Sequence, residues 1–342
     1  SIFKEMGNLG LLGSTIQGYD CPGVDYMSYG LVAREIEKVD SGYRSMMSVQ
    51  SSLVMHPINV FGSEEQKQKY LPNMVSGHCI GAICMTEPGA GSDLQGMKTT
   101  ATKTDSGWSI NGSKTFITNG QNSSIYIVAA KTNLAVAGSK GTSLFLVDGD
   151  SEGFSRGQNL HKMGQHAGDT SELFFDNVAV TQNDLLGELD QGFIGLMNEL
   201  PRERLSCATV GVAHAEGALA LALEYVKERH AFGQPIAKLQ SIRHKIAEMK
   251  SQTELHRIMM EHYKALLTEK KLTTEQASIA KFSACEMECK VIDEALQMFG
   301  GYGYMKEYPI SRFYVDARVQ RIYGGTSEIM KEIIGKSVIG RV

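Results

Sequence analysis

The hydrophobic pattern of this chain changes twice, near residue 80 and again near residue 187. Residues 1–80 carry the spacing of amphipathic helices, whereas residues 81–187 carry short apolar runs separated by Gly, Asn, Asp and Ser. Long helix-type patterns return over residues 188–342. The sequence therefore predicts an α+β multidomain fold, with an N-terminal α-helical domain (1–80), a middle β domain (81–187) and a C-terminal helical domain (188–342). Clefts between such domains often bind cofactors.

One N-terminal helix is expected over residues 28–39, followed by an apolar, Met-rich stretch over residues 45–61 that is expected to be broken near Pro57. The residues expected on its buried face are Leu31, Val32, Ile36 and Val39. The residues expected on its exposed face are Arg34, Glu35, Glu37 and Lys38. Capping boxes predict two further helix starts, one at Ser63 with Gln66 and one at Thr273 with Gln276.

In the middle of the chain, residues 108–110 and 114–117 flank Asn111-Gly112, a dipeptide that predicts a hairpin turn. Three more strands are expected over residues 125–130, 143–147 and 172–175. These short runs make up the expected β domain.

Charge and cysteine content narrow the classes of function. The formal net charge is −4, so no bulk basicity favours nucleic acid or an anionic membrane. No uninterrupted apolar run reaches the length of a membrane span, and the first residues are expected to form neither a signal nor a transit peptide. None of the six cysteines forms a CxxC pair, which favours buried thiols in a reducing compartment over a metal site.

A glycine-rich run, Met85 to Asp93 (MTEPGAGSD), follows the expected start of the β domain. Small residues with free N–H groups and hydroxyls can approach a phosphate or a flavin closely. An ordinary strand-to-strand turn has the same composition, so the residues alone leave both interpretations open.

This run closely resembles the flavin-binding signature of the acyl-CoA dehydrogenase family. Further matches stand at the family's spacings over residues 114–120, 169–175, 229–233, 297–303 and 323–326. The resemblance covers almost the whole chain, except that the family usually has another helical segment at its N-terminus. It implies an α-helical domain, a β-barrel-like domain and a four-helix-bundle domain, with one FAD per subunit. It also implies an acyl-CoA substrate, electron-transfer flavoprotein as a partner, a homotetramer (a dimer of dimers), and a location in the bacterial cytoplasm or mitochondrial matrix.

The resemblance assigns flavin contacts in the middle of the chain. Thr86 would face the flavin ring, Ser92 would contact flavin phosphate and substrate, and Thr118 would donate a hydrogen bond to the reactive flavin nitrogen. Phe116 stands where many relatives have Trp beside the isoalloxazine. Phenylalanine keeps the apolar face but lacks the indole N–H.

Other FAD contacts are carried over to Met85, Gly91, Thr326 and Glu328. A further set resembles the residues that hold the nucleotide end of a neighbouring subunit's FAD: Arg229, Phe232, Gln240, Gln297 and Gly301. A guanidinium matches a pyrophosphate with paired donors, although a solvated charge at a helix end would look the same in sequence at Arg229.

The commoner catalytic base of the family is absent. The family removes an α-proton from a thioester while the β-hydrogen leaves as hydride, and many relatives carry the base as Glu in a Tyr-Glu-Gly-Thr string. Here residues 323–326 read Tyr-Gly-Gly-Thr, with Gly324 at that place. A glycine cannot accept a proton.

A minority branch, including the long-chain and isovaleryl-CoA dehydrogenases, has its base in a Leu-x-x-Glu-Arg-Leu string. Residues 200–205 read Leu-Pro-Arg-Glu-Arg-Leu, which predicts Glu203 as the base. Without this resemblance, Glu203 close after Pro201 would suit the first turn of a helix. The backbone N–H of Gly324, with a ribityl hydroxyl, would bind the thioester oxygen, and burial would raise the pKa of Glu203.

The substrate is predicted only as an acyl-CoA. Arg204 resembles a CoA-facing residue, with a helix-surface charge as the alternative, and Tyr323 and Gly325 are further substrate candidates. Residues 39–53 resemble glutaryl-CoA dehydrogenases, in which the counterparts of Arg44 and Ser48 bind a distal carboxylate. A dicarboxylyl-CoA substrate therefore stays open, as does an internal ion pair between Arg44 and Asp40. A flavin- or acyl-CoA-binding scaffold without turnover and an acyl-CoA oxidase are the alternatives in function.

Overall fold

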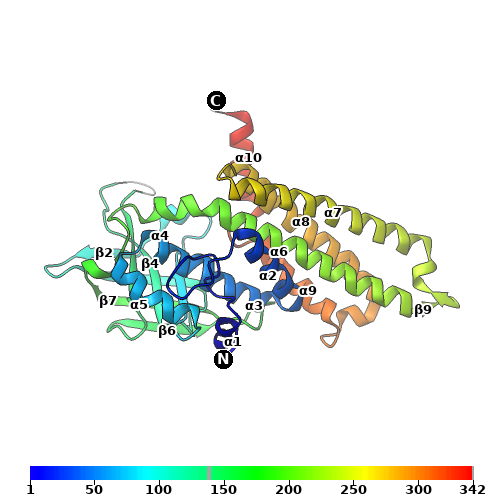
Figure 1. Cartoon of the computed structure of the whole chain (residues 1–342), viewed down its shortest axis with the longest axis horizontal. Coiled ribbons are helices and arrows are strands. Elements are labelled where there is room, and N and C mark those ends of the chain that lie inside the picture. Colours follow the sequence, from blue (N-terminus) through cyan, green and yellow to red (C-terminus); the bar gives the residue numbers. More distant parts are fainter. Residues whose placement is uncertain (137–139, 341–342) are drawn as a thin grey trace. The chain divides into compact units, whose positions relative to one another are not determined.

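The computed structural model describes residues 1–136 and 140–340, which form two compact units. The first unit contains Ser1–Tyr29, Tyr43–Lys162 and His166–Glu199, and it combines most of the N-terminal helices with the sheet. The second contains Gly30–Gly42, Met163–Gln165 and Leu200–Val342, and it is helical (Figure 1). The predicted order of α, β and α is confirmed. The domain boundaries at 80 and 187 stay a prediction, and residues 341–342 of the third expected domain lie outside the described residues.

The N-terminal part of the chain is helical over α1 (Ile2–Asn8), α2 (Tyr26–Val39), α3 (Ser41–Ser48), a π-helical segment (Val49–Met55), α4 (His56–Phe61) and α5 (Glu64–Val75). The expected break near Pro57 is not found, because the π-helical segment continues directly into α4. Pro57 lies in the first turn of α4, where proline is tolerated because the first N–H groups of a helix have no intrahelical acceptor. The capping box of Ser63 and Gln66 is confirmed at the start of α5.

The predicted face of α2 is wrong. Leu31 and Val39 are exposed, whereas Ala33 and Glu37 are buried one turn apart. The reason is a polar contact, because Glu37 accepts a hydrogen bond from Ser41 and lies 3.8 Å from Nδ1 of His214. A charged residue thus occupies the buried face that hydrophobic periodicity assigns to apolar side chains.

The sheet has eight strands in the order β6-β7-β3-β2-β4-β5-β8, with β1 pairing in parallel to β4. Their bounds are β1 (Gly81–Cys84), β2 (Thr100–Lys103), β3 (Trp108–Thr118), β4 (Ile125–Lys131), β5 (Thr142–Asp148), β6 (Phe154–Asn159), β7 (Thr170–Val180) and β8 (Leu185–Leu186). The three strands expected after residue 120 correspond to β4, β5 and β7. The π-helical segment packs against β1 and shares one unit with the sheet, as do α1, α4 and α5, whereas most of α2 belongs to the second unit.

The hairpin predicted at Asn111-Gly112 is wrong, because both residues lie inside the single strand β3. The chain instead reverses between β2 and β3, where the N–H of Thr104 donates to the carbonyl of Gly107 at 2.9 Å. Gly112 marks an irregular register between β3 and β7. A Cβ on Gly112 would meet Cα of Thr99 at 2.8 Å, so glycine is needed for close backbone approach rather than for a turn.

The helical unit is built from α6 (Gly192–Glu228), α7 (Gln240–Thr268), α8 (Thr274–Phe299), α9 (Pro309–Ala317) and α10 (Ser327–Ile339). α7, α9 and α10 each pack against α8, and small buried residues on α6 and α8 let these two helices approach (Figure 1). The capping box of Thr273 and Gln276 is confirmed at the start of α8. Glu203 is not a helix-start residue, because α6 begins at Gly192 and Pro201 lies in its interior.

By length and composition alone, α6 would be long enough to cross a membrane, which a count of uninterrupted apolar residues does not reveal. However, 72% of its most apolar window is buried inside the protein. That burial is the property of a core helix, and such a helix is weak grounds for a membrane span.

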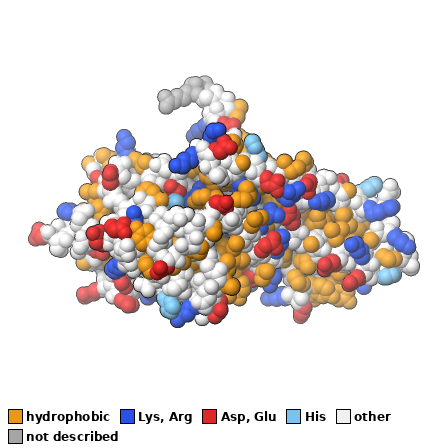
Figure 2. Space-filling view, viewed as in Figure 1, with side chains coloured by type: hydrophobic (Ala, Val, Ile, Leu, Met, Phe, Trp, Pro, Cys, Tyr) orange, Lys and Arg blue, Asp and Glu red, His pale blue; other side chains and the backbone are white. Residues whose placement is uncertain are grey.

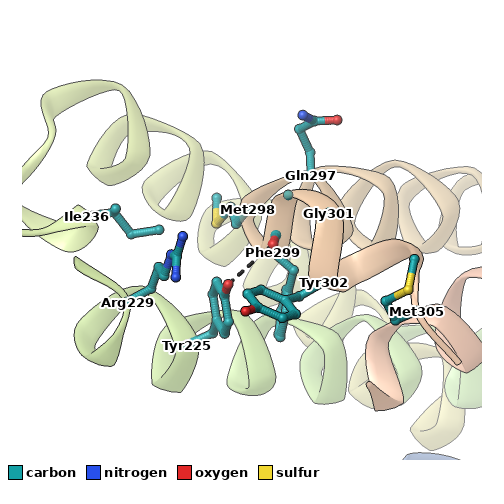
Figure 3. A pocket seen from close by; sticks show the side chains of 10 residues that line it. Tyr225, Arg229, Ile236, Gln297, Met298, Phe299, Gly301, Tyr302 and Met305 are labelled. Atoms are coloured by element: carbon teal, nitrogen blue, oxygen red, sulfur yellow. Dashed lines mark hydrogen bonds between the residues drawn. The ribbon is translucent and has the colours of Figure 1, made fainter. Parts of the chain in front are cut away.

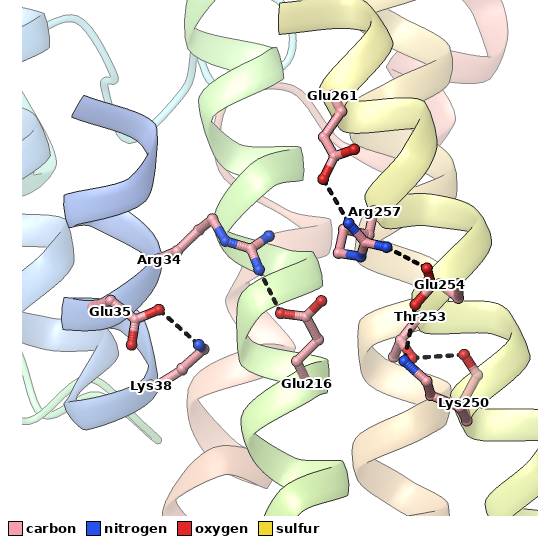
Figure 4. A network of polar contacts seen from close by, with 9 residues as sticks. All are labelled: Arg34, Glu35, Lys38, Glu216, Lys250, Thr253, Glu254, Arg257 and Glu261. Carbon is pink, nitrogen blue, oxygen red and sulfur yellow. Dashed lines mark hydrogen bonds and ion pairs between the residues drawn. The ribbon is translucent and has the colours of Figure 1, made fainter. Parts of the chain in front are cut away.

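Ion pairs cover part of the helical unit (Figure 4). Nη2 of Arg34 lies 2.6 Å from Glu216 and joins α2 to α6, while Arg257 pairs with Glu254 and Glu261 along α7. Figure 2 shows hydrophobic side chains gathered over the end of this unit that carries the short strand β9 (His230–Ala231). Surface ion pairs of this kind contribute little stability, so the unit depends mainly on its apolar core.

Candidate active site

The glycine-rich run forms an open turn at the end of β1. Glu87 and Ala90 exchange backbone hydrogen bonds of 3.0 and 3.1 Å across the turn, and Ser92 is exposed. A Cβ added to Gly89 or Gly91 would meet nothing within 4 Å. The backbone of this turn therefore offers an open cradle for a close-fitting ligand such as a flavin pyrophosphate.

A buried ion pair fixes the turn to β3. Nζ of Lys114 donates to Oε1 of Glu87 at 2.9 Å and to the carbonyl of Met85 at 3.1 Å, and the N–H of Thr115 donates to the carbonyl of Thr86 at 2.9 Å. Burial lowers the pKa of Lys114, against the opposing influence of Glu87. Neither Glu87 nor Lys114 was assigned a role from the sequence, although both lie inside the matched runs.

Two residues of β3 have the form expected of a flavin platform. Phe116 is 67% exposed and has a φ of +58°, a strained conformation for a bulky residue, and Thr118 ends the strand. Thr118 pairs with Thr170 of β7, so the matched runs 114–120 and 169–175 lie side by side. An exposed aromatic ring held by a strained backbone fits stacking on a planar cofactor.

The predicted base lies in the helical unit, on the same helix face as a residue that reaches the Gly324 turn. Cys207 follows Glu203 by one helical turn on α6, and a Cβ at Gly324 would lie 3.6 Å from Sγ of Cys207. Gly324 and Gly325 have φ values of +63° and +101°. The fold thus brings the neighbourhood of Glu203 to the turn in which the commoner base is missing.

The electrostatic surroundings of Glu203 suit a base. Glu203 is partly buried, and burial raises the pKa of its carboxyl group, with Arg202, Arg204 and Lys281 acting in the opposite direction. Burial lowers the pKa of Arg202 to about 10 and also lowers that of Arg204. Arg204 is buried and its Nη1 lies 3.4 Å from Oγ of Ser278, so it is not a charge on the helix surface.

The turn after Gly325 leads directly into α10. The side chain of Thr326 accepts a hydrogen bond from the N–H of Ile329 and caps the helix, and Glu328 lies exposed in the first turn. The hydroxyl of Tyr323 donates to Gln320 at 2.7 Å. Residues 323–328 are therefore an ordered turn and helix start, at which backbone N–H groups favour an anionic group.

A hollow of about 470 Å³ lies at the end of α6 and α8 (Figure 3). Its walls include Arg229, Gln297 and Gly301, three of the five residues assigned to the nucleotide end of FAD. The guanidinium of Arg229 lies 5.7 Å from the ring centre of Tyr302, and a Cβ at Gly301 would meet nothing within 4 Å. A cation beside aromatic rings and an open glycine backbone fit a nucleotide diphosphate.

The other two residues of that set lie outside the walls of the hollow. Phe232 is 90% exposed with a φ of +54° in the hairpin of β9 and β10 (Gln234–Pro235), and Gln240 begins α7. Phe232 has the same combination of exposure and backbone strain as Phe116. Both rings are therefore presented to a ligand or partner rather than to the core.

The two residues matched to glutaryl-CoA dehydrogenases lie in the first unit, on α3. Arg44 is only 4% exposed, and Ser48 accepts a hydrogen bond of 3.3 Å from the hydroxyl of Tyr29. Asp40 belongs to the second unit, where its carboxylate lies 3.9 Å from Arg312. Burial of the Arg44 guanidinium shows that it is not a solvated surface charge.

One buried polar cluster was missed by the sequence analysis. Glu37, His214 and Glu288 are fully buried, and their potential ligand atoms all lie within 4.8 Å of one another. Nδ1 of His214 lies 2.8 Å from Glu288, and this partner raises the pKa of the imidazole although burial opposes it. A hydrogen bond between the imidazole and the carboxylate accounts for that contact. The six cysteines, all within the described residues, are free thiols.

Three family models match consecutive parts of the chain. The N-terminal, middle and C-terminal domains of acyl-CoA dehydrogenase match residues 1–78, 82–178 and 190–339. The chain belongs to the acyl-CoA dehydrogenase family. It is therefore an FAD-dependent oxidoreductase that acts on the CH–CH group of an acyl-CoA.

Individual members of the family are similar over nearly the full chain. The mitochondrial long-chain specific acyl-CoA dehydrogenase of Mus musculus is 45% identical over 340 residues, which is 99% of this chain and 79% of the relative. An acyl-CoA dehydrogenase structure from Geobacillus kaustophilus is 40% identical with a TM-score of 0.96, over 98% of this chain and 89% of that one. A glutaryl-CoA dehydrogenase of Mycobacterium smegmatis in complex with FADH2 is 34% identical with a TM-score of 0.95, over 99% and 86% of the two chains.

Proposed function

We propose that this acyl-CoA dehydrogenase converts an acyl-CoA thioester to the trans-2-enoyl-CoA with Glu203 as the base. The observation that carries the proposal is the surroundings of Glu203. Glu203 is partly buried on α6, one helical turn before Cys207, whose Sγ lies beside the Gly324 turn, and burial raises the pKa of the Glu203 carboxyl group. Gly324 itself can accept no proton. A raised pKa makes a carboxylate a better proton acceptor near neutral pH, provided that the group is still ionised.

In this mechanism the chain supplies proton transfer and polarisation. The Glu203 carboxylate accepts the α-proton, and the N–H of Gly324 donates to the thioester carbonyl oxygen, where negative charge develops. A glycine with a φ of +63° presents its N–H without a side chain in the way. Tyr323, Gly325 and Arg204 are proposed to line the CoA side of this site.

The residues present also fit FAD. When bound, FAD supplies the acceptor for the β-hydrogen, which leaves as hydride. Thr86, Gly91 and Ser92, with Met85, would hold the flavin and its phosphate at the open turn, and Phe116 and Thr118 would contact the ring. The nucleotide end of a neighbouring subunit's FAD would be held by Arg229, Phe232, Gln240, Gln297 and Gly301, and further FAD contacts would come from Thr326 and Glu328 at the start of α10.

Electron-transfer flavoprotein is the proposed electron acceptor, and the proposed assembly is a homotetramer, in a bacterial cytoplasm or mitochondrial matrix. An acyl-CoA oxidase would instead pass electrons to oxygen. Comparing reoxidation of the reduced enzyme by air with reoxidation by electron-transfer flavoprotein separates the two. Rapid reoxidation by air alone would assign the protein to the oxidases.

The acyl group is proposed to be monocarboxylic, with a dicarboxylyl-CoA as the second candidate. The Mus musculus relative named above is specific for long chains and supports the first candidate. The buried guanidinium of Arg44, with Ser48 on the same helix, supports the second. Turnover of monocarboxylic substrates only, with none of glutaryl-CoA, would remove Arg44 and Ser48 from the substrate site.

The test is an anaerobic titration of the FAD-loaded protein with straight-chain, branched and dicarboxylic acyl-CoAs. Bleaching of the flavin by one of them is expected in the wild type and in E224Q, which changes an exposed carboxylate on the same helix. E203Q is expected to keep FAD and lose bleaching, because an amide cannot accept the α-proton. Absence of bleaching in the wild type with every substrate would favour the scaffold alternative, and bleaching of E203Q would overturn the assignment of the base.

A further inference from the structure

A lysine outside every matched run is buried beside the proposed base. Lys281 lies on α8 and its exposed fraction is 0%. Removing an ammonium group from water is costly unless it is hydrogen-bonded and near opposite charge. The contacts of the Lys281 side chain therefore indicate its role.

Lys281 holds the Gly324 turn. Its Nζ donates to the carbonyl oxygen of Gly325 at 2.5 Å. Gly324 and Gly325 both have positive φ and no side chains of their own, so their backbone is unusually free to move. A bond from a buried helix to the Gly325 carbonyl limits that freedom and fixes the Gly325–Thr326 peptide, which lies two peptide units after the one that carries the N–H of Gly324.

α8 holds the flanks of the same turn as well. Oε1 of Glu286 accepts hydrogen bonds of 2.7 Å from Nε of Arg321 and from Oγ of Ser327. These two contacts lie before and after Gly324 and Gly325, and Lys281 contacts Gly325 itself. Three contacts from one helix therefore hold residues 321–327.

Lys281 also lies on the side of α8 that faces the base. Ser278, three residues earlier on α8, lies 3.4 Å from the guanidinium of Arg204, the neighbour of Glu203. Residues three apart share a helix face, so Lys281 is directed toward the same turn of α6. The positive charge of Lys281 acts on Glu203 and favours its ionised form.

We propose that Lys281 is a positioning residue for acyl-CoA dehydrogenation, which anchors the Gly324–Gly325 turn and keeps a positive charge beside Glu203. This inference rests on the proposed role of Glu203. Lys281 exchanges no proton with the substrate. It acts through two other groups, the N–H of Gly324 and the carboxylate of Glu203.

The charged and titratable groups around Glu203 give the expected pH effect. Arg202 and Arg204 flank it on α6, with Cys207 one turn on, and Lys281 faces it from α8. Removing the Lys281 charge disfavours the ionised carboxylate, which raises the pKa of Glu203. Because the base must be ionised, the rate of flavin reduction would then require a higher pH.

The test measures anaerobic flavin reduction over a range of pH in FAD-loaded K281M and K281Q, with K290M as the control. Lys290 is exposed on the same helix, so K290M is expected to behave as the wild type. K281M is expected to bind FAD but to reduce it about 10- to 100-fold more slowly, since a misplacement of 1 Å can cost about 100-fold. Its pH profile is expected to move to higher pH.

K281Q separates the two effects, because glutamine can donate to Gly325 but carries no charge. It is expected to keep more of the rate than K281M and to show the same displacement of the pH profile. If K281M does not fold, the profile of K281Q alone decides. Wild-type rates and profiles in both variants would overturn the role of Lys281.

E203Q is measured in parallel so that the two failures can be told apart. If E203Q loses flavin reduction and the Lys281 variants behave as wild type, the base stands and Lys281 is only a structural residue. If E203Q is reduced normally by substrate, the proposed base is wrong, and the inference on Lys281 falls with it.

Discussion

At the scale of single residues, backbone conformation distinguishes a glycine that the structure requires from one that alanine could replace. Gly324 has a φ of +63°, but a Cβ there would only reach ordinary contact with Cys207 at 3.6 Å. Space is available, so the cost of a side chain is conformational rather than steric. Gly335 lies inside α10 without positive φ, and a Cβ there would meet nothing within 4 Å.

Substitution by alanine is therefore expected to have opposite effects on stability at Gly324 and at Gly335. G324A is expected to destabilise the protein by about 1 kcal/mol or more, because alanine disfavours positive φ. G335A is expected to stabilise it by up to about 1 kcal/mol, because alanine is the better helix former. Thermal unfolding of both FAD-loaded variants measures this, and an equal change in the same direction would contradict the interpretation of the turn.

At the scale of secondary-structure elements, a buried ion pair helps to hold the proposed flavin turn, residues 85–93, against β3. Lys114 contacts both Glu87 and the backbone of Met85, and Glu87 also accepts from the N–H groups of Lys98 and Thr99 at 2.6 and 3.0 Å. Three segments of chain thus meet at one carboxylate: the turn itself, residues 98–99 and β3. Such a pair specifies the position of the turn more than it adds stability.

K114M is accordingly expected to cost about 3–5 kcal/mol, because it leaves the Glu87 carboxylate buried without its cation. It should also weaken FAD retention, since the turn carries Thr86. The double variant K114M/E87Q removes both charges and keeps a hydrogen-bond acceptor, so it is expected to lose less stability than K114M. Thermal unfolding and bound FAD per chain provide the measurements, with K98M as an exposed-lysine control. A double variant as unstable as the single one would contradict this account.

The elements also show what the sequence could and could not predict. The capping boxes of Ser63 and Thr273, which act within one helical turn, were predicted correctly. The Asn111-Gly112 signal failed because pairing of β3 with both β2 and β7 outweighed the local turn preference. The buried face of α2 was mispredicted because Glu37 contacts His214, far away in sequence.

The candidate site divides in the same way. The matched runs include the open turn of residues 85–93, three residues that line the hollow at the end of α6 and α8, and Glu203. They gave no indication of Lys281 or of the Lys114–Glu87 pair, because single lysines carry no pattern of their own. Such residues are recognised only when folding shows that a charged side chain is buried and what it contacts.

At the scale of the whole molecule, the hollow at the end of α6 and α8 is the proposed site for the nucleotide end of FAD. R229A removes the guanidinium on its wall and is expected to weaken FAD binding about 10- to 100-fold, as expected for a lost charge-assisted hydrogen bond. K227A removes an exposed cation two residues earlier, outside the residues that line the hollow, and should bind FAD normally. FAD dissociation measured by fluorescence, with the mass of each variant in solution, tests this. Equal FAD affinity in both variants would remove Arg229 from the cofactor site.

Glu203 on α6 is the proposed base because residue 324, where the family resemblance places the commoner glutamate, is a glycine. Its most direct test is exchange of the α-hydrogen of a bound, non-oxidisable acyl-CoA thioester with deuterium from D2O, which reports proton abstraction without oxidation. Exchange is expected in the FAD-loaded wild type and in E224Q, increasing with pH as Glu203 ionises. In E203Q it is expected to fall at least about 100-fold, within the range of a general base, while the thioester still binds. Exchange at the wild-type rate in E203Q would show that the base lies elsewhere.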